Sequence, residues 1–186
     1  PDPDPGPTSV VLGGSAVKGP LRDADVNVFA FDPSNSANGF KGALIDSGTT
    51  NANALYAGIE LPQPLTPPYI VEVVSNASTI DLSTGLPPVI TRMRTILTQA
   101  MIEDGTAHTT PVSTMVADLA LEDVVPASTG ADLLNDLPDA GSRIKSTLGF
   151  GLDSSIDLLT TPPMVNDSTT DALSQAAVAA FRAANE

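Results

Sequence analysis

Cysteine is absent from this sequence, which excludes disulfide bonds, thiol catalysis and thiolate metal sites. Tryptophan is absent too, and the single histidine is His108. A structural zinc site needs several histidine or cysteine ligands, so it is excluded on the same grounds. These absences remove most of the chemistries that enzymes use, and we expect a protein that is not an enzyme.

Basic residues are scarce, because 8 lysines and arginines stand against 22 aspartates and glutamates and leave a formal net charge of −14. A surface this acidic repels phosphate groups, so neither nucleic acid nor an anionic membrane is an expected partner. No apolar run is long enough to predict a membrane span. The charge fits a protein kept soluble outside the cell, although acids that merely solvate the surface explain it more simply.

Residues 1–8, PDPDPGPT, alternate proline with acid and predict an extended, solvated linker with nothing to bury. Such linkers commonly join a folded domain to a lipid anchor or to a preceding domain, and we expect such an attachment upstream of residue 1. A tail left by trimming between domains is the alternative.

From residue 9 onward the hydrophobic pattern is that of short β-strands. Strands are predicted over residues 9–17, 25–31, 43–47, 55–61 and 69–75. A bulge is expected at Gly13-Gly14. Residues 89–101 predict one more strand, with a helix as the alternative. This spacing is typical of an antiparallel β-sandwich of the transthyretin or immunoglobulin kind, which we assign to residues 9–102.

Helical spacing dominates residues 103–186. Thr110 and Pro111 supply an N-cap and a first-turn proline for a helix that ends near Glu122. The apolar face predicted for this helix consists of Val112, Met115, Val116 and Leu119.

Two more helical regions follow. A pair of helices is predicted over residues 131–137 and 142–148, separated by Pro138 and closed by Gly149. A last helix is predicted over 171–184. The predicted fold class is α+β: an N-terminal sandwich and a mainly helical segment packed on or beside it.

Residues 13–32, GGSAVKGPLRDADVNVFAFD, resemble the start of the carboxypeptidase regulatory-like, or transthyretin-like, β-sandwich of bacterial surface proteins. The residues that carry the match are Gly14, Gly19, Pro20, Leu21, Ala24, Val26 and Val28. The later chain is similar to a helical segment of exported bacterial lipoproteins and adhesins, through residues 110–115, 148–152 and 157–162. These motifs are turns, caps and core positions. The resemblance therefore implies a fold and a cell-surface location, and it carries no catalytic residues over.

His108 is the one residue that could serve a Ser-His-Asp triad. It falls in a polar stretch, residues 105–110, and no Gly-x-Ser-x-Gly motif occurs in the chain. We therefore interpret it as a solvent-exposed loop histidine.

Calcium is the only cofactor for which candidate ligands exist. Asp32, Asn35 and Asn38 lie in the polar loop DPSNSANG, and a second group comprises Asn166, Asp167 and Asp171. The loop lacks the glycine and the terminal glutamate of an EF-hand. Turn formation by these side chains is the favoured explanation, and no other cofactor is expected.

Glu72 is unusual because it interrupts the apolar strand YIVEVVS, on the same face as Ile70 and Val74. If that face points inward, the carboxyl group needs a partner. Lys18 and Glu72, with Asn76 as a poor third member, could form an intramolecular amide cross-link of the kind found in some adhesins. An outward glutamate on a half-exposed sheet is the favoured alternative.

The N-terminal residues Ser9, Val10, Val11 and Leu12 form a short β-prone run behind a flexible leader. Such a run is suited to adding a strand to the sheet edge of a neighbouring molecule. We therefore expect a non-catalytic, extracellular structural or adhesion module of a bacterial cell-surface protein, able to assemble into a filament with copies of itself or with other surface proteins.

A carbohydrate-binding accessory module of a secreted polysaccharide-degrading enzyme is the alternative. With no tryptophan in the chain, its stacking residues would be Tyr56 and Tyr69. A hydrolase that uses paired carboxylates is a third and less favoured hypothesis.

Overall fold

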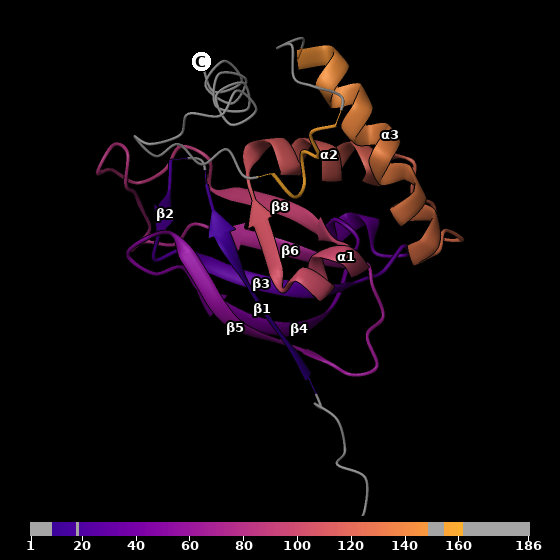
Figure 1. Ribbon diagram of the computed structural model, residues 1–186, viewed down its shortest axis with the longest axis horizontal. Coiled ribbons are helices and arrows are strands. Elements are labelled where there is room, and N and C mark those ends of the chain that lie inside the picture. Colours follow the sequence, from indigo (N-terminus) through magenta and orange to yellow (C-terminus); the bar gives the residue numbers. More distant parts are fainter. Residues whose placement is uncertain (1–8, 18, 149–154, 162–186) are drawn as a thin grey trace, which may run out of the picture.

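The computed structural model describes residues 9–17, 19–148 and 155–161, and over these the chain is an α+β fold in which two β-sheets face each other (Figure 1). The strands are β1 (Ser9–Ala16), β2 (Leu21–Arg22), β3 (Asp25–Phe31), β4 (Lys41–Thr49), β5 (Leu55–Pro62), β6 (Tyr69–Val74), β7 (Ile80–Asp81), β8 (Arg92–Leu97) and β9 (Thr106–Thr109). The helices are the 3-10 turn η1 (Ser36–Asn38), α1 (Gln99–Asp104), α2 (Pro111–Glu122) and α3 (Gly130–Leu148). The predicted fold class is confirmed.

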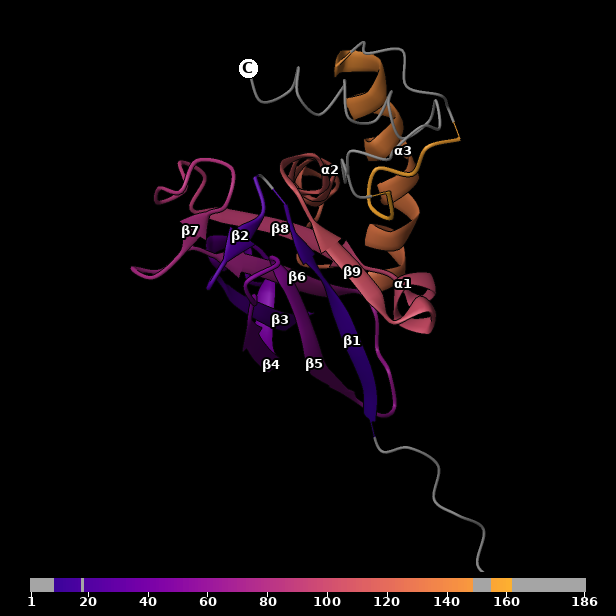
Figure 2. The ribbon, with the colours of Figure 1, turned by 60° about the vertical axis from the view of Figure 1, so that its left-hand side comes forward.

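The two main sheets have the strand orders β5-β1-β9 and β4-β3-β6-β8, and a small third sheet pairs β2 with β7. β1 runs between its two neighbours, antiparallel to β5 and parallel to β9 (Figure 2). The core between the sheets is mainly aliphatic, as the low aromatic content requires. Its members include Leu12 from β1, Val26 and Val28 from β3, and Val71 and Val73 from β6. Val26 and Val28, two of the residues that carry the resemblance, both lie in this core.

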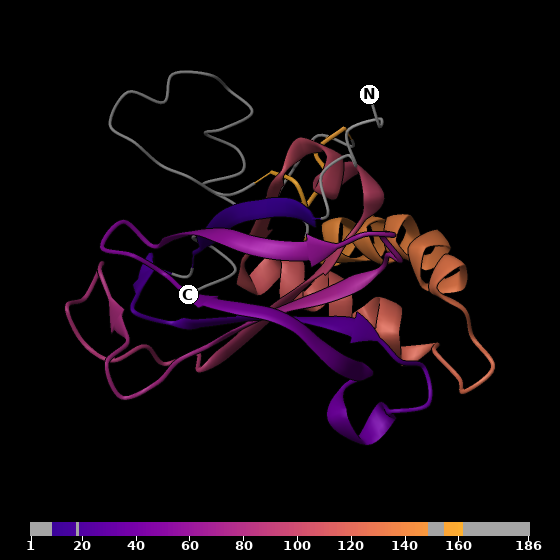
Figure 3. The same cartoon turned by 90° about the horizontal axis from the view of Figure 1, so that it is seen from below.

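A second core lies on the other face of the four-stranded sheet, where α2 and α3 pack (Figure 1). Seen from below, the strands lie in front of these helices (Figure 3). Ile70 of β6 and Ile96 of β8 point into this second core, together with the partly buried Phe29 of β3. Because both faces of the central strand β6 are covered, its sequence YIVEVV is almost continuously apolar.

Helix α2 begins as predicted, but its buried face was predicted wrongly. Thr110 caps the helix in a reciprocal capping box with Ser113. The buried residues are Ser113, Val116, Ala117, Ala120 and Leu121, so only Val116 belongs to the predicted face. Met115 is 37% exposed. The reason lies in the small residues: a face of serine and alanines lets the helix axis approach the sheet closely, and the Ser113 hydroxyl donates to the carbonyl of Arg94 in β8.

Helix α3 is continuous, and the predicted pair of helices split by Pro138 is wrong. Pro138 lies inside the helix, at an exposed position. The residues Leu133, Leu137 and Ala140 form one buried stripe that runs past the proline and packs in the second core. Burial of this stripe outweighs the cost of an internal proline, about 3 kcal/mol.

Two elements differ from the prediction near the end of the sandwich. Residues 89–101 were expected to form one strand, whereas the structure has β8 followed by the start of α1. β9 lies beyond residue 102 and pairs with β1, so the sheet includes a strand from the segment expected to be helical. The predicted stop at Gly149 and the helix over 171–184 lie outside the described residues. Among the described helices, none has the length and apolar character to cross a membrane.

Candidate functional site

The predicted donor strand, Ser9 to Leu12, forms the first half of β1 and is the centre of the candidate site. These residues pair with β5 of the same chain, in the register Val10 with Leu61 and Leu12 with Ile59. The second half of β1, Gly13 to Ala16, also pairs with β9. Leu12 and Ala16 are fully buried in the core, whereas Val11 is 58% exposed. β1 therefore fills a slot between two strands that do not otherwise pair with each other.

The slot is narrow where the two halves of β1 meet. The register shifts between Leu12 and Gly14, which confirms the predicted bulge at the glycine pair. A Cβ atom on Gly14 would lie 1.7 Å from the carbonyl oxygen of Ala107 in β9. The Tyr56 hydroxyl of β5 donates to that same carbonyl at 2.7 Å, and burial raises the pKa of Tyr56. Only a glycine at position 14 lets β1 lie this deep between its neighbours.

The chain leaves β1 through a tight connection. Val17 forms a bridge to Pro20, and its backbone N–H donates to the Thr109 carbonyl at 3.0 Å. Gly19 has a φ of +67°, and a Cβ atom there would lie 2.2 Å from a carboxylate oxygen of Asp81. This connection separates the terminal strand from the rest of the sandwich.

His108 is not a solvent-exposed loop residue, and that prediction is wrong. It lies in β9, directly opposite Ser15 of β1, and its Nδ1 is 2.8 Å from the Ser15 hydroxyl. Burial lowers the pKa of His108, and the carboxylate of Asp104 partly opposes this shift. The strand was missed because the segment TAHT is short and its strand partner lies 93 residues away in the chain.

Ser15, His108 and Asp104 do not form a working triad. Ser15 is only 1% exposed, so its hydroxyl is closed to a substrate. The Asp104 carboxylate accepts a hydrogen bond of 2.6 Å from the Thr106 hydroxyl. The contact of Ser15 with His108 joins β1 to β9, and His108 and Asp104 line a cavity of about 190 Å³.

The candidate calcium ligands in the described part of the chain form a turn. The Asp32 carboxylate accepts hydrogen bonds from the backbone N–H and the hydroxyl of Ser34, and these lower the pKa of Asp32. The Asn35 side chain donates to the Lys41 carbonyl, and Asn38 belongs to η1. No group of three acidic or histidine residues that could hold a metal ion occurs among the described residues. Asn166, Asp167 and Asp171 lie outside them.

Glu72 points inward, so the expectation of an outward glutamate on a half-exposed sheet is wrong. It is 5% exposed, on the helix-covered face that it shares with Ile70. Its partner is Lys41 of β4, whose ammonium group lies 3.0 Å from both carboxylate oxygens. Lys18, the expected cross-linking residue, lies outside the described residues. Asn76 donates instead to the Asp23 carbonyl and to Asp25, so it belongs to a turn contact.

The two tyrosines cannot serve as a stacking platform for a sugar. Tyr56 and Tyr69 are 3% and 2% exposed. The hydroxyl of Tyr69 accepts a hydrogen bond from the backbone N–H of Thr66 at 2.8 Å. Both rings belong to the core between the sheets.

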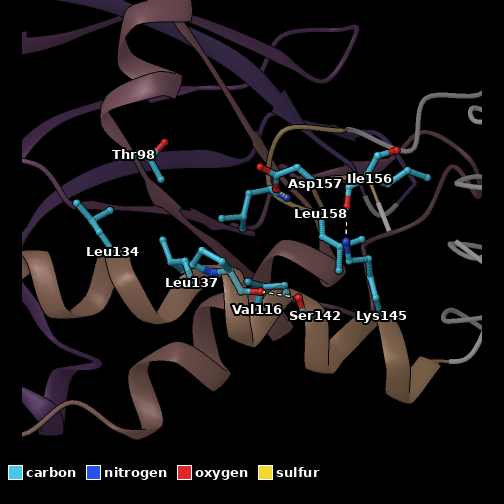
Figure 4. A pocket seen from close by; sticks show the side chains of 13 residues that line it. Thr98, Val116, Leu134, Leu137, Ser142, Lys145, Ile156, Asp157 and Leu158 are labelled. Atoms are coloured by element: carbon cyan, nitrogen blue, oxygen red, sulfur yellow. Dashed lines mark hydrogen bonds between the residues drawn. The ribbon is translucent and has the colours of Figure 1, made fainter. Parts of the chain in front are cut away.

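One cavity of about 360 Å³ lies between α3 and residues 155–161 (Figure 4). Its walls are largely apolar and include Leu134 and Leu137 of α3, Val116 of α2 and Leu158. The Lys145 ammonium donates to the Ile156 carbonyl across it at 2.9 Å (Figure 4). The contacts within this cavity hold residues 155–161 against α3.

In comparisons with known proteins, no family model matches the chain and no curated protein is significantly similar to it. The resemblance to the carboxypeptidase regulatory-like sandwich therefore stays a prediction from the sequence.

Proposed function

We propose that this chain is a non-catalytic structural module of an extracellular bacterial surface protein, and that copies assemble by exchanging β1. The observation that supports the proposal is the position of β1. It is the first strand of the described residues, yet it lies in the middle of its sheet and buries Leu12 and Ala16.

Exchange of a terminal strand keeps every native contact and changes only which copy supplies it. β1 of one molecule would occupy the slot between β5 and β9 of the next, with the same register and the same buried side chains. The free-energy difference between closed and exchanged forms then rests on the connection after Ala16 and on concentration. Such exchange gives a dimer when two copies trade strands, and a filament when each copy donates to the next.

A carbohydrate-binding module remains the alternative function. Burial of Tyr56 and Tyr69 removes the stacking residues that it would have used. A glycan would need to be held by polar groups alone, and the exchange hypothesis is therefore favoured.

The absence of cysteine allows a direct test by disulfide trapping. Val11 of β1 and Glu60 of β5 are opposite each other in the register, and directly opposed strand residues lie within disulfide reach. One chain carries Val11→Cys and the other carries Glu60→Cys. A mixture incubated or refolded together at high concentration should form a covalent heterodimer on oxidation, since the two sulfurs meet only when β1 is exchanged.

Two controls decide the result. The double variant in one chain should form an intramolecular disulfide and so confirm the register. A mixture of Val11→Cys with Val89→Cys, an exposed position on the β7–β8 connection, measures random collision. If the Glu60→Cys mixture gives no more heterodimer than the Val89→Cys mixture, the exchange hypothesis is wrong.

A further inference from the structure

Another cavity, of about 320 Å³, opens between η1, α2 and the helix-covered face of the four-stranded sheet. The charged side chains that line it come from four elements of the fold: Lys41 of β4, Glu72 of β6, Arg92 and Arg94 of β8, and Asp118 of α2. The backbone of residues 37–39 forms one wall. This cavity is separate from the slot of β1 and from the cavity beside His108.

This cavity gathers three of the 8 basic residues of a chain whose formal net charge is −14. The two carboxylates that line it leave a local excess of positive charge. At physiological ionic strength, charges beyond about 8 Å are largely screened, so the groups in the cavity decide which ion is attracted there. Acidic groups farther away than this therefore weaken the local excess only in part.

Two of the three cations are held by partners within the fold. The Lys41 ammonium is held by Glu72 and lies 5.1 Å from the centre of the Phe29 ring. The Arg94 guanidinium donates through Nε to Asp118 and through a terminal nitrogen to the Gly39 carbonyl. These two cations are fixed before any ligand arrives, which lowers the entropic cost of binding.

Arg92 differs from them because its donors are available. Its side chain is 63% exposed, and within the described residues its one charged contact is an ion pair of 3.5 Å between Nε and Glu72. The guanidinium group therefore retains donors that can reach an anion at the cavity mouth. A planar fork of N–H groups matches the two oxygens of a carboxylate.

We propose that this cavity binds a small organic carboxylate, with Arg92 as the principal ligand-binding residue and Lys41 and Arg94 as the fixed positive wall. The volume is at the lower end of the range for ligand sites, which fits a molecule of about monosaccharide size. The site is independent of strand exchange, since none of its lining residues belongs to β1, β5 or β9.

The test is a titration of the full chain by NMR with galacturonate, and with galactose as the neutral molecule of the same shape. Galacturonate should shift the backbone amide signals of Gly39, Arg92, Arg94 and Thr114, and galactose should leave them in place. Acetate as a third probe shows whether the carboxylate suffices without the sugar ring, and shifts of the same four signals by acetate also support the proposal.

Variants that remove a positive or a negative charge from the cavity should change the affinity in opposite directions. Arg92→Gln should weaken galacturonate binding at least fivefold, whereas Arg143→Gln, which removes the same charge from an exposed position on α3, should change it less than twofold. Asp118→Asn keeps an acceptor for Arg94, removes a competing negative charge and should tighten binding at least twofold. The proposal is overturned if neither carboxylate shifts these signals, if galactose shifts them as much as galacturonate does, or if Arg92→Gln binds like the unaltered chain.

Discussion

Gly14 of β1 and Ala107 of β9 approach so closely that the space of a single methyl group at position 14 is already filled by the Ala107 carbonyl oxygen. The contact is between two backbones, so no flexible side chain can move aside. β1 can therefore lie this close to β9 only with glycine at position 14.

Gly14→Ala should therefore destabilise the fold by about 3 kcal/mol or more, because the added Cβ forces β1 and β9 apart. The loss is measured as a lower midpoint of urea unfolding. Gly141→Ala is the matched control: a Cβ atom there meets nothing within 4 Å, and Gly141 lies inside α3. It should stabilise the chain by up to about 1 kcal/mol. Equal midpoints for the two variants would contradict the close approach.

The stability of the chain should fall as the pH is lowered below neutrality. Burial holds the pKa of folded His108 below its ordinary value of 6.5, so the unfolded chain takes up the proton first. The stability that neutral His108 contributes is present above pH 6.5 and is lost as the pH falls through that value toward the lower folded pKa. Urea unfolding at a series of pH values measures this slope. In a His108→Gln variant the slope between pH 7 and the onset of carboxylate titration should be smaller, and an unchanged slope would assign it to other groups.

The buried pair of Lys41 and Glu72 predicts a strong dependence of stability on both partners. Lys41→Met leaves the Glu72 carboxylate buried with only the more distant Arg92, and should cost about 3–5 kcal/mol. The double variant Lys41→Met/Glu72→Leu removes both charges and should recover most of that loss. Urea unfolding of the unaltered chain, Lys41→Met, Glu72→Leu and the double variant measures the coupling energy of the pair. A double variant that is no more stable than Lys41→Met would contradict the prediction.

Pro138 offers a test of the continuous helix. Pro138→Ala restores a backbone donor inside α3 at an exposed position, so the variant should be more stable by about 1–3 kcal/mol. Thermal unfolding followed by circular dichroism is a suitable measurement. If the chain were kinked or broken at this residue, the alanine variant would gain little.

Features set by neighbouring residues were predictable from the sequence. The alternation in residues 25–31 predicted β3, the short apolar run over 69–75 predicted β6, and Thr110-Pro111 predicted the start of α2. In each case the signal is local: a side-chain period of two, a short run of β-branched residues, or a cap followed by a proline.

Features set by distant residues were not predictable. The Glu72 carboxylate is paired with the Lys41 ammonium, 31 positions away in the chain. No sequence pattern near either residue predicts this pair. The contact of Ser15 with His108, across the parallel strands β1 and β9, also joins residues that are distant in the chain. The buried face of α2 was missed for a different reason: its alanines and serine are weakly apolar, so the larger residues on a neighbouring face dominated the pattern. These two pairs, together with the close contact of Gly14 and Ala107, lie at the candidate sites.

The central position of β1 also bears on mechanics. A pull on the chain at Ser9, directed along the strand, loads the hydrogen bonds to β5 and to β9 at the same time, in shear. A pull at right angles to the strand opens them one after another. If the chain is tethered through its N-terminal segment, the strand that would join one copy to the next is also the one that bears tension most evenly across its sheet.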